Sequence, residues 1–146
     1  MSSYHFYEAK NKDTDEIFEI LKNFEKEVEE LNYPKVDNDK LKSRIFYFIE
    51  HGKILMVKNL DKNKLIGVSV MHNTEYLWSK ENILNVQVIY VLPEYRSLEI
   101  FNNIMKIIKT QANEKAIHLS ISTKLIASKL LERVGFEQMG GIWRMK

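Results

Sequence analysis

Arg96 and Ser97 stand where an apolar run, residues 83–92, gives way to a helical pattern. Ser97 can cap that helix, and the first amides of any helix have no hydrogen-bond partner within it. These amides, the helix dipole and the guanidinium together favour a bound phosphate. The spacing therefore predicts a phosphate-binding turn over residues 96–101. The plainer interpretation, a solvated arginine beside an ordinary helix cap, stays open.

Three side chains could take part in proton transfer or orient a water: His72, Gln87 and Tyr90. His72 follows a predicted hairpin strand and titrates near neutral pH, although a surface position explains it as well. Gln87 and Tyr90 lie inside the apolar run, where a structural hydrogen bond and cross-strand packing are the plainer interpretations. The sequence thus leaves the catalytic residue unknown, with these three as weak candidates.

Composition excludes several classes of function. The net charge is +2 and no basic face is concentrated enough for a nucleic-acid partner. No apolar run approaches the roughly 20 residues that cross a bilayer, so no membrane partner is predicted. There is no cysteine, and the four histidines have no ligand spacing, so no metal site is predicted. We expect a cytoplasmic protein whose 146 residues, 1–146, form one domain.

The elements that must position these residues follow from the hydrophobic periodicity. Strands are predicted at residues 4–9, 54–57, 65–71, 83–92, 117–121 and 142–145, with 83–92 as a central strand buried on both sides. Helices are predicted from an Asp13 cap to Tyr33, from an Asp37 cap to Gly52, from a Ser97 cap past residue 108, and over 125–134. The order is β-α-α-β-β-β-α-β-α-β, and the strand–helix–strand unit requires one parallel pair. This is an α/β (α+β) fold, a mixed central sheet with helices on both faces.

That order, with three local stretches, resembles the GNAT superfamily of acetyl-CoA-dependent N-acyltransferases. The stretches are residues 88–96 (VIYVLPEYR), 65–68 (LIGV) and 130–136 (LLERVGF). The resemblance implies an acetyl-CoA co-substrate and transfer of its acyl group to the primary amine of a small molecule or a protein. Its pantetheine arm would lie on the backbone of Ile89, Tyr90 and Val91. Its pyrophosphate would lie on Arg96, Ser97, Leu98, Glu99, Ile100 and Phe101.

Three positions depart from the pattern of that family. Glu99 and Phe101 replace a glycine and a small residue in the phosphate turn, and a carboxylate there predicts weakened binding of acetyl-CoA. Leu131 replaces a tyrosine that protonates the leaving thiolate in many members. An alternative therefore stays open, a catalytically inactive GNAT-fold protein of viral (phage) type that serves as a binding or structural module. Family members often pair through edge strands, which makes a homodimer an expectation too.

Overall fold

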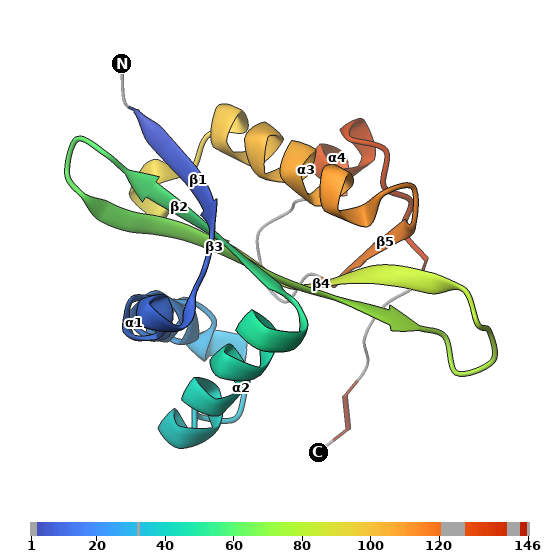
Figure 1. The fold of residues 1–146 in the computed structure, drawn as a ribbon, viewed down its shortest axis with the longest axis horizontal. Helices are drawn as coiled ribbons and strands as arrows, with labels where there is room; N and C mark the ends of the chain where they lie inside the picture. The colour runs from blue at the N-terminus through green and yellow to red at the C-terminus, as the bar shows by residue number, and fades with distance from the viewer. Residues whose placement is uncertain (1–2, 32, 121–127, 140–143, 146) are drawn as a thin grey trace.

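In a computed structural model, residues 3–31, 33–120, 128–139 and 144–145 are described, and within them the chain forms one five-stranded sheet (Figure 1). Its strands stand in chain order, β1-β2-β3-β4-β5. The first four are antiparallel neighbours and β5 runs parallel to β4. Their bounds are β1 Tyr4–Glu8, β2 Lys53–Asn59, β3 Lys64–Glu75, β4 Asn82–Val91 and β5 Ala116–Leu119. The predicted mixed sheet and its parallel crossover are confirmed.

Helices cover both faces of this sheet, as predicted. In Figure 1, α1 and α2 lie on one side of the strands and α3 lies on the other. The bounds are α1 Thr14–Glu27, α2 Asn38–His51, α3 Leu98–Ala112 and α4 Ser128–Arg133. Short 3-10 turns stand at η1 Asn11–Asp13, η2 Glu29–Leu31 and η3 Pro93–Tyr95. The predicted residues 121, 125–127, 142 and 143 lie outside the described ranges, and the described Arg144 and Met145 are not in a strand.

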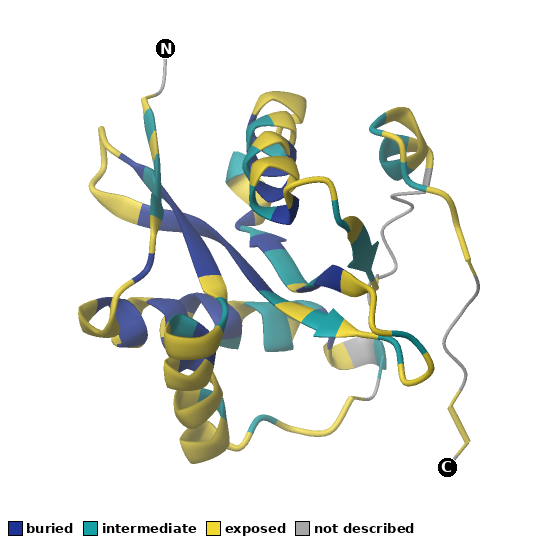
Figure 2. Cartoon of the chain, turned by 45° about the vertical axis from the view of Figure 1, so that its right-hand side comes forward, coloured by how far each residue is buried: buried dark blue, intermediate teal, exposed yellow. Residues whose placement is uncertain are grey.

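The core lies between the helices and the sheet (Figure 2). Ile17 of α1, Ile66 of β3 and Ile104 of α3 are fully buried, so both layers contribute to it. The strand with most buried residues is β3, in which Leu65 through Met71 are all buried. The prediction of residues 83–92 as the central strand is therefore wrong, since β4 lies one place from the centre and is buried only in part. The apolar run was a poor guide because half-buried valine and isoleucine look the same in sequence as buried ones.

Three predicted caps can be compared with the structure. Asp37 Oδ1 accepts a hydrogen bond from the amide of Lys40 (2.9 Å), and Ser97 Oγ accepts one from the amide of Ile100 (3.2 Å), which confirms both. Asp13 does not cap α1 with its side chain. Its Oδ2 accepts instead from the amide of Lys10 at 2.8 Å, because the chain makes a 3-10 turn before the helix begins.

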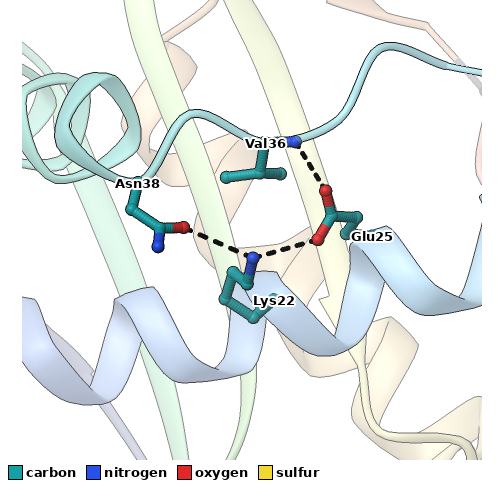
Figure 3. A network of polar contacts seen from close by, with 4 residues as sticks. All are labelled: Lys22, Glu25, Val36 and Asn38. Carbon is teal, nitrogen blue, oxygen red and sulfur yellow. Dashed lines mark hydrogen bonds and ion pairs between the residues drawn. The ribbon is translucent and has the colours of Figure 1, made fainter.

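A polar network fixes the connection between α1 and α2 (Figure 3). Glu25 accepts from the amide of Val36 at 2.6 Å and from the ammonium of Lys22 at 3.1 Å. Lys22 also donates to Asn38 Oδ1 at 3.3 Å. The backbone hydrogen bond, followed by the Lys22 contact, lowers the pKa of Glu25. The carboxylate therefore pins a segment with no helical or strand hydrogen bonds of its own.

Candidate functional site

A bulge in β4 separates its two halves. Val88 pairs with Val70 of β3, whereas Val86 pairs with Met71, so Gln87 is an extra residue on β4. The described pairing with β5 covers only Ile83–Val86 against Ala116–Leu119. An extra residue bends its strand and increases the local twist. From Gln87 onward, β4 therefore turns away from its parallel neighbour and presents an open edge within the described part of the chain.

The backbone groups on this edge can be identified from one hydrogen bond. The amide of Leu92 donates to the carbonyl of Ile66 on β3 at 2.8 Å. In a trans peptide the C=O points opposite to the N–H, so the carbonyl of Val91 points away from β3. Alternation then places the backbone groups of Ile89 on the same open side and those of Tyr90 toward β3. Of the three residues predicted to hold a pantetheine, Ile89 and Val91 offer backbone groups to the open edge.

The open edge leads through η3 into the first turn of α3. The amides of Leu98 and Glu99 have no partner within the helix, while that of Ile100 is capped by Ser97. Glu99 is exposed, so its carboxylate is free to extend into solvent, and Phe101 packs against the core. Phe101 is therefore accommodated by core packing, and the weakened binding expected from Glu99 stays a prediction.

The structure places Arg96 at the end of this edge. Its Nε donates to the Val91 carbonyl at 2.8 Å, and its Nη2 pairs with Glu27 Oε2 of α1 at 2.8 Å. Glu27 raises the pKa of Arg96, and the hydrogen bond from Arg96 lowers the pKa of Glu27. Arg96 is thus exposed but fixed by two side-chain hydrogen bonds, so it is more than a solvated loop residue.

Tyr90 belongs to the same cluster, with its side chain on the α1 side of β4. Its ring is buried, lies edge-on to Phe24 of α1 at 5.4 Å between centroids, and has the Arg96 guanidinium 5.6 Å from its centre. Burial, followed by the carboxylate of Glu27, raises the pKa of Tyr90 to about 12. The phenol is therefore held protonated beside Glu27, consistent with the packing role that the sequence analysis favoured.

The other two catalytic candidates lie apart from this cluster. His72 of β3 packs against Phe48 of α2, with 5.3 Å between ring centroids, and its Nδ1 is buried without a hydrogen bond. Burial, and next the charge of Arg44, lowers the pKa of His72. Gln87 is exposed at the bulge itself. The structure thus brings Tyr90, Val91, Arg96 and Ser97 together and leaves His72 under α2.

A groove of about 830 Å³ runs along α1 to the end of β4. Its lining is apolar at Ile20, Leu65 and Leu92, and five carboxylates outnumber the two lysines, Lys26 and Lys64, among its charged residues. Those acidic residues are Asp15, Glu16, Glu19, Glu27 and Glu94. The α1 side of the β4 terminus is therefore open and negatively charged, in contrast to the amides that line the opposite edge.

The loop between β3 and β4 carries an aromatic group. The rings of Tyr76 and Trp78 stack at 5.1 Å, and the Tyr76 hydroxyl bonds to Nε2 of His118 on β5 at 2.5 Å. Trp78 remains 81% exposed. The hydroxyl thus attaches the loop to β5. Among the described residues no group of three or more His, Asp or Glu side chains could hold a metal ion, and no helix is long and apolar enough to cross a membrane.

Comparison with known proteins identifies the fold's family. The family model described as "Acetyltransferase (GNAT) domain" matches residues 20–144. The chain belongs to the GNAT acetyltransferase family. The resemblance read from residues 65–68, 88–96 and 130–136 is thereby confirmed. None of the curated proteins compared with the sequence matches it.

Solved GNAT structures show how closely the fold is shared. A possible acetyltransferase from Clostridium difficile 630 is 21% identical with a TM-score of 0.73, and the match covers 98% of this chain and 97% of that one. A predicted acetyltransferase with acetyl-CoA from Clostridium acetobutylicum is 14% identical with a TM-score of 0.77, over 99% and 96%. An aminoglycoside antibiotic 6'-N-acetyltransferase from Acinetobacter baumannii is 14% identical with a TM-score of 0.74, over 99% and 97%.

Two features of this GNAT domain escaped the sequence analysis. Glu27 lies 69 residues from Arg96 in a helix full of similar acidic residues, and no local signal distinguishes it. The bulge at Gln87 could not be predicted from the sequence. The largely apolar run around it has no regular alternation of polar and apolar residues that an extra residue would interrupt. The helix end at 130–136 was easier to predict. Gly135 has φ +101°, and the amide of Phe136 reaches back to the carbonyl of Leu131 at 3.0 Å, as a glycine C-cap requires.

Proposed function

We propose that this protein transfers an acetyl group from acetyl-CoA to a primary amine, with residues 1–146 acting as one acyltransferase domain. The observation that carries the proposal is the continuity of the Ile89 and Val91 backbone edge with the first turn of α3. An extended amide chain can add to such an edge as a strand does. A pyrophosphate at the far end of that chain would meet the free amides of Leu98 and Glu99.

The chain's own groups have distinct roles in this proposal. The backbone of Ile89 and Val91 would hold the two amides of the pantetheine arm, and Ser97 would donate its hydroxyl to phosphate while still capping α3. A backbone amide on the open edge near the bulge would donate to the thioester carbonyl oxygen and stabilise the negative charge that develops there. These donors are fixed by the sheet and need no rearrangement during the reaction.

The reaction balances without a protein nucleophile. The amine nitrogen bonds to the thioester carbon, the carbon–sulfur bond breaks, and sulfur leaves as the thiolate. The nitrogen loses one proton to water and the thiolate takes one up. Neither His72 under α2 nor Tyr90, with its pKa of about 12, is placed to carry these protons, and Leu131 has none to give. Positioning of the two substrates would therefore supply most of the rate.

Two measurements test the proposal. Calorimetric titration with CoA should give saturable binding, and thiol release from acetyl-CoA should then be followed with a panel of primary amines. The panel should include an aminoglycoside, a polyamine and a lysine peptide. An aminoglycoside alone would be too narrow, because the Acinetobacter enzyme shares only its fold with this chain. Absence of CoA binding at millimolar ligand would refute the proposal. Binding without turnover on any amine would favour the non-catalytic alternative raised by Glu99, Phe101 and Leu131.

A further inference from the structure

The open edge of β4 already has an occupant from the chain itself. Arg96 Nε donates at 2.8 Å to the Val91 carbonyl, which is the last backbone acceptor on that edge. The first amide of a ligand that added to the edge would need the same oxygen. Arg96 and such a ligand therefore compete for one hydrogen-bond acceptor.

The arginine is held in this position from α1. Its Nη2 pairs with Glu27 Oε2 at 2.8 Å, and the two side chains are only 32% and 27% exposed, so water screens the pair less than at an open surface. The same carboxylate helps to raise the pKa of Tyr90, whose ring packs on Phe24 of α1. Glu27 is thus a fixed anion on a packed helix, which makes it a firm partner for the guanidinium.

The other anions of the groove that contains Glu27 are side chains of the chain itself, so none of them can leave with Arg96. The lining of the groove adds Glu94 and Glu19 to the carboxylates near the guanidinium, together with two lysines, and it does not include the first amides of α3. A ligand phosphate at those amides would be the one mobile anion able to draw Arg96 from Glu27. Arginine binds carboxylate and phosphate with the same planar fork of donors.

We propose that Glu27 and Arg96 form a latch that closes the open edge of β4 in the free protein and is released when CoA binds. On release, Arg96 leaves the Val91 carbonyl to the pantetheine arm and passes from Glu27 to a phosphate. The latch rests on the proposed function, since it regulates the same site. It makes Glu27 an autoinhibitory residue that contacts neither substrate.

The variant Glu27→Gln tests the latch. Replacing the anion weakens the hold on Arg96, so CoA should bind about fivefold more tightly, the gain expected when a half-buried ion pair no longer has to be broken. Pantetheine, which has no phosphate, should gain by a similar factor, because the Val91 carbonyl is uncovered for it too. The matched control is Glu19→Gln, which removes the same charge from the same helix and groove and should change neither affinity by more than about twofold.

A spectroscopic measurement on the wild type gives independent evidence. The Nε–H of Arg96 should appear in a ¹⁵N–¹H spectrum of the free protein as a slowly exchanging signal, since it is bonded to Val91. Addition of CoA should shift that signal and speed its exchange. This readout does not depend on whether the Glu27→Gln variant keeps full stability.

The remaining outcomes distinguish a failure of the latch from a failure of the proposed function. If wild type and Glu27→Gln both fail to bind CoA, the proposed function falls and the latch with it. If wild type binds CoA but Glu27→Gln binds it equally or more weakly, only the latch is refuted. A gain for CoA without a gain for pantetheine, or an equal gain in Glu19→Gln, would show simple charge repulsion and also refute the latch.

Discussion

Ser97 caps α3 and has a second, phosphate-binding role in the proposed function, and a pair of variants distinguishes the two roles. Its Oγ accepts the amide of Ile100 at 3.2 Å and so satisfies one free donor at the start of α3. Ser97→Ala removes that acceptor and should cost about 1 kcal/mol of unfolding free energy, which lowers the melting temperature by about 3 °C for a domain of this size. Ser97→Asp keeps the acceptor and adds an anion at the positive end of the helix dipole, so its melting temperature should equal or exceed that of wild type.

The same two variants should have a different order in ligand binding. Ser97→Ala loses one hydroxyl donor, and CoA affinity should fall by no more than about tenfold. In Ser97→Asp a carboxylate faces two phosphate charges. Each such pair costs about 1 kcal/mol at 4 Å even in water, so the sum is about 2 kcal/mol, or nearly thirtyfold in affinity. The more stable variant should therefore be the weaker binder.

The assay combines thermal unfolding followed by circular dichroism with calorimetric titration of CoA at two salt concentrations. The affinity lost in Ser97→Asp should shrink at higher salt because ions screen the added charge. If Ser97→Asp binds CoA as tightly as wild type, the pyrophosphate does not lie at the start of α3 and the assigned site is wrong. An unchanged melting temperature in Ser97→Ala would show that the cap contributes nothing to stability.

Three further predictions concern the scaffold. Gly52→Ala would place a Cβ 2.5 Å from a carbonyl oxygen of β3, so we expect a loss of about 2 kcal/mol and a melting temperature about 6 °C lower; unchanged melting would contradict that contact. The pKa of His72 is lowered from 6.5, so folding favours its neutral form and stability should fall as pH drops below about 6.5. Between pH 7.5 and 5.5 the melting temperature should drop less in His72→Gln than in wild type or in His51→Gln, and equal drops would refute this role. In Glu25→Gln the amide of Val36 should exchange with deuterium at least tenfold faster, whereas unchanged exchange would mean that another group protects it.

Prediction from the sequence succeeded where the signal was local. Ser97 and Asp37 were identified as caps because such residues bond to amides only three positions away. The parallel pairing of β4 with β5 followed from the length of chain between them, which leaves room for a helix and no hairpin. Local chemistry and connectivity therefore sufficed for the elements and their order.

Prediction failed where the outcome depends on distant partners. Asp13 was expected to cap α1, but its carboxylate accepts a hydrogen bond from the amide of Lys10 three residues earlier. The local sequence is compatible with both hydrogen bonds, so it does not distinguish them. The hydrogen bond between Arg96 and Glu27 was not predicted, because only the packing of α1 on the sheet brings Glu27 near, while the phosphate-binding role of Arg96 stays a prediction. Which of several equivalent carboxylates meets an arginine is decided by tertiary packing.

Because β4 has one extra residue, the residues that face a given side of the sheet are even-numbered in one half of the strand and odd-numbered in the other. Val86 and Val88 are two positions apart, yet they face adjacent partners, Met71 and Val70. Excision of Gln87 would leave both sets of pairs in place and join them into a regular ladder, so β4 would lose its bulge together with the bend and the extra twist. Without that bend, the segment from Val88 to Val91 would run on in line with the half of β4 that pairs with β5. The open edge on which the proposed function rests thus depends less on the side chain of Gln87 than on the presence of this one extra residue.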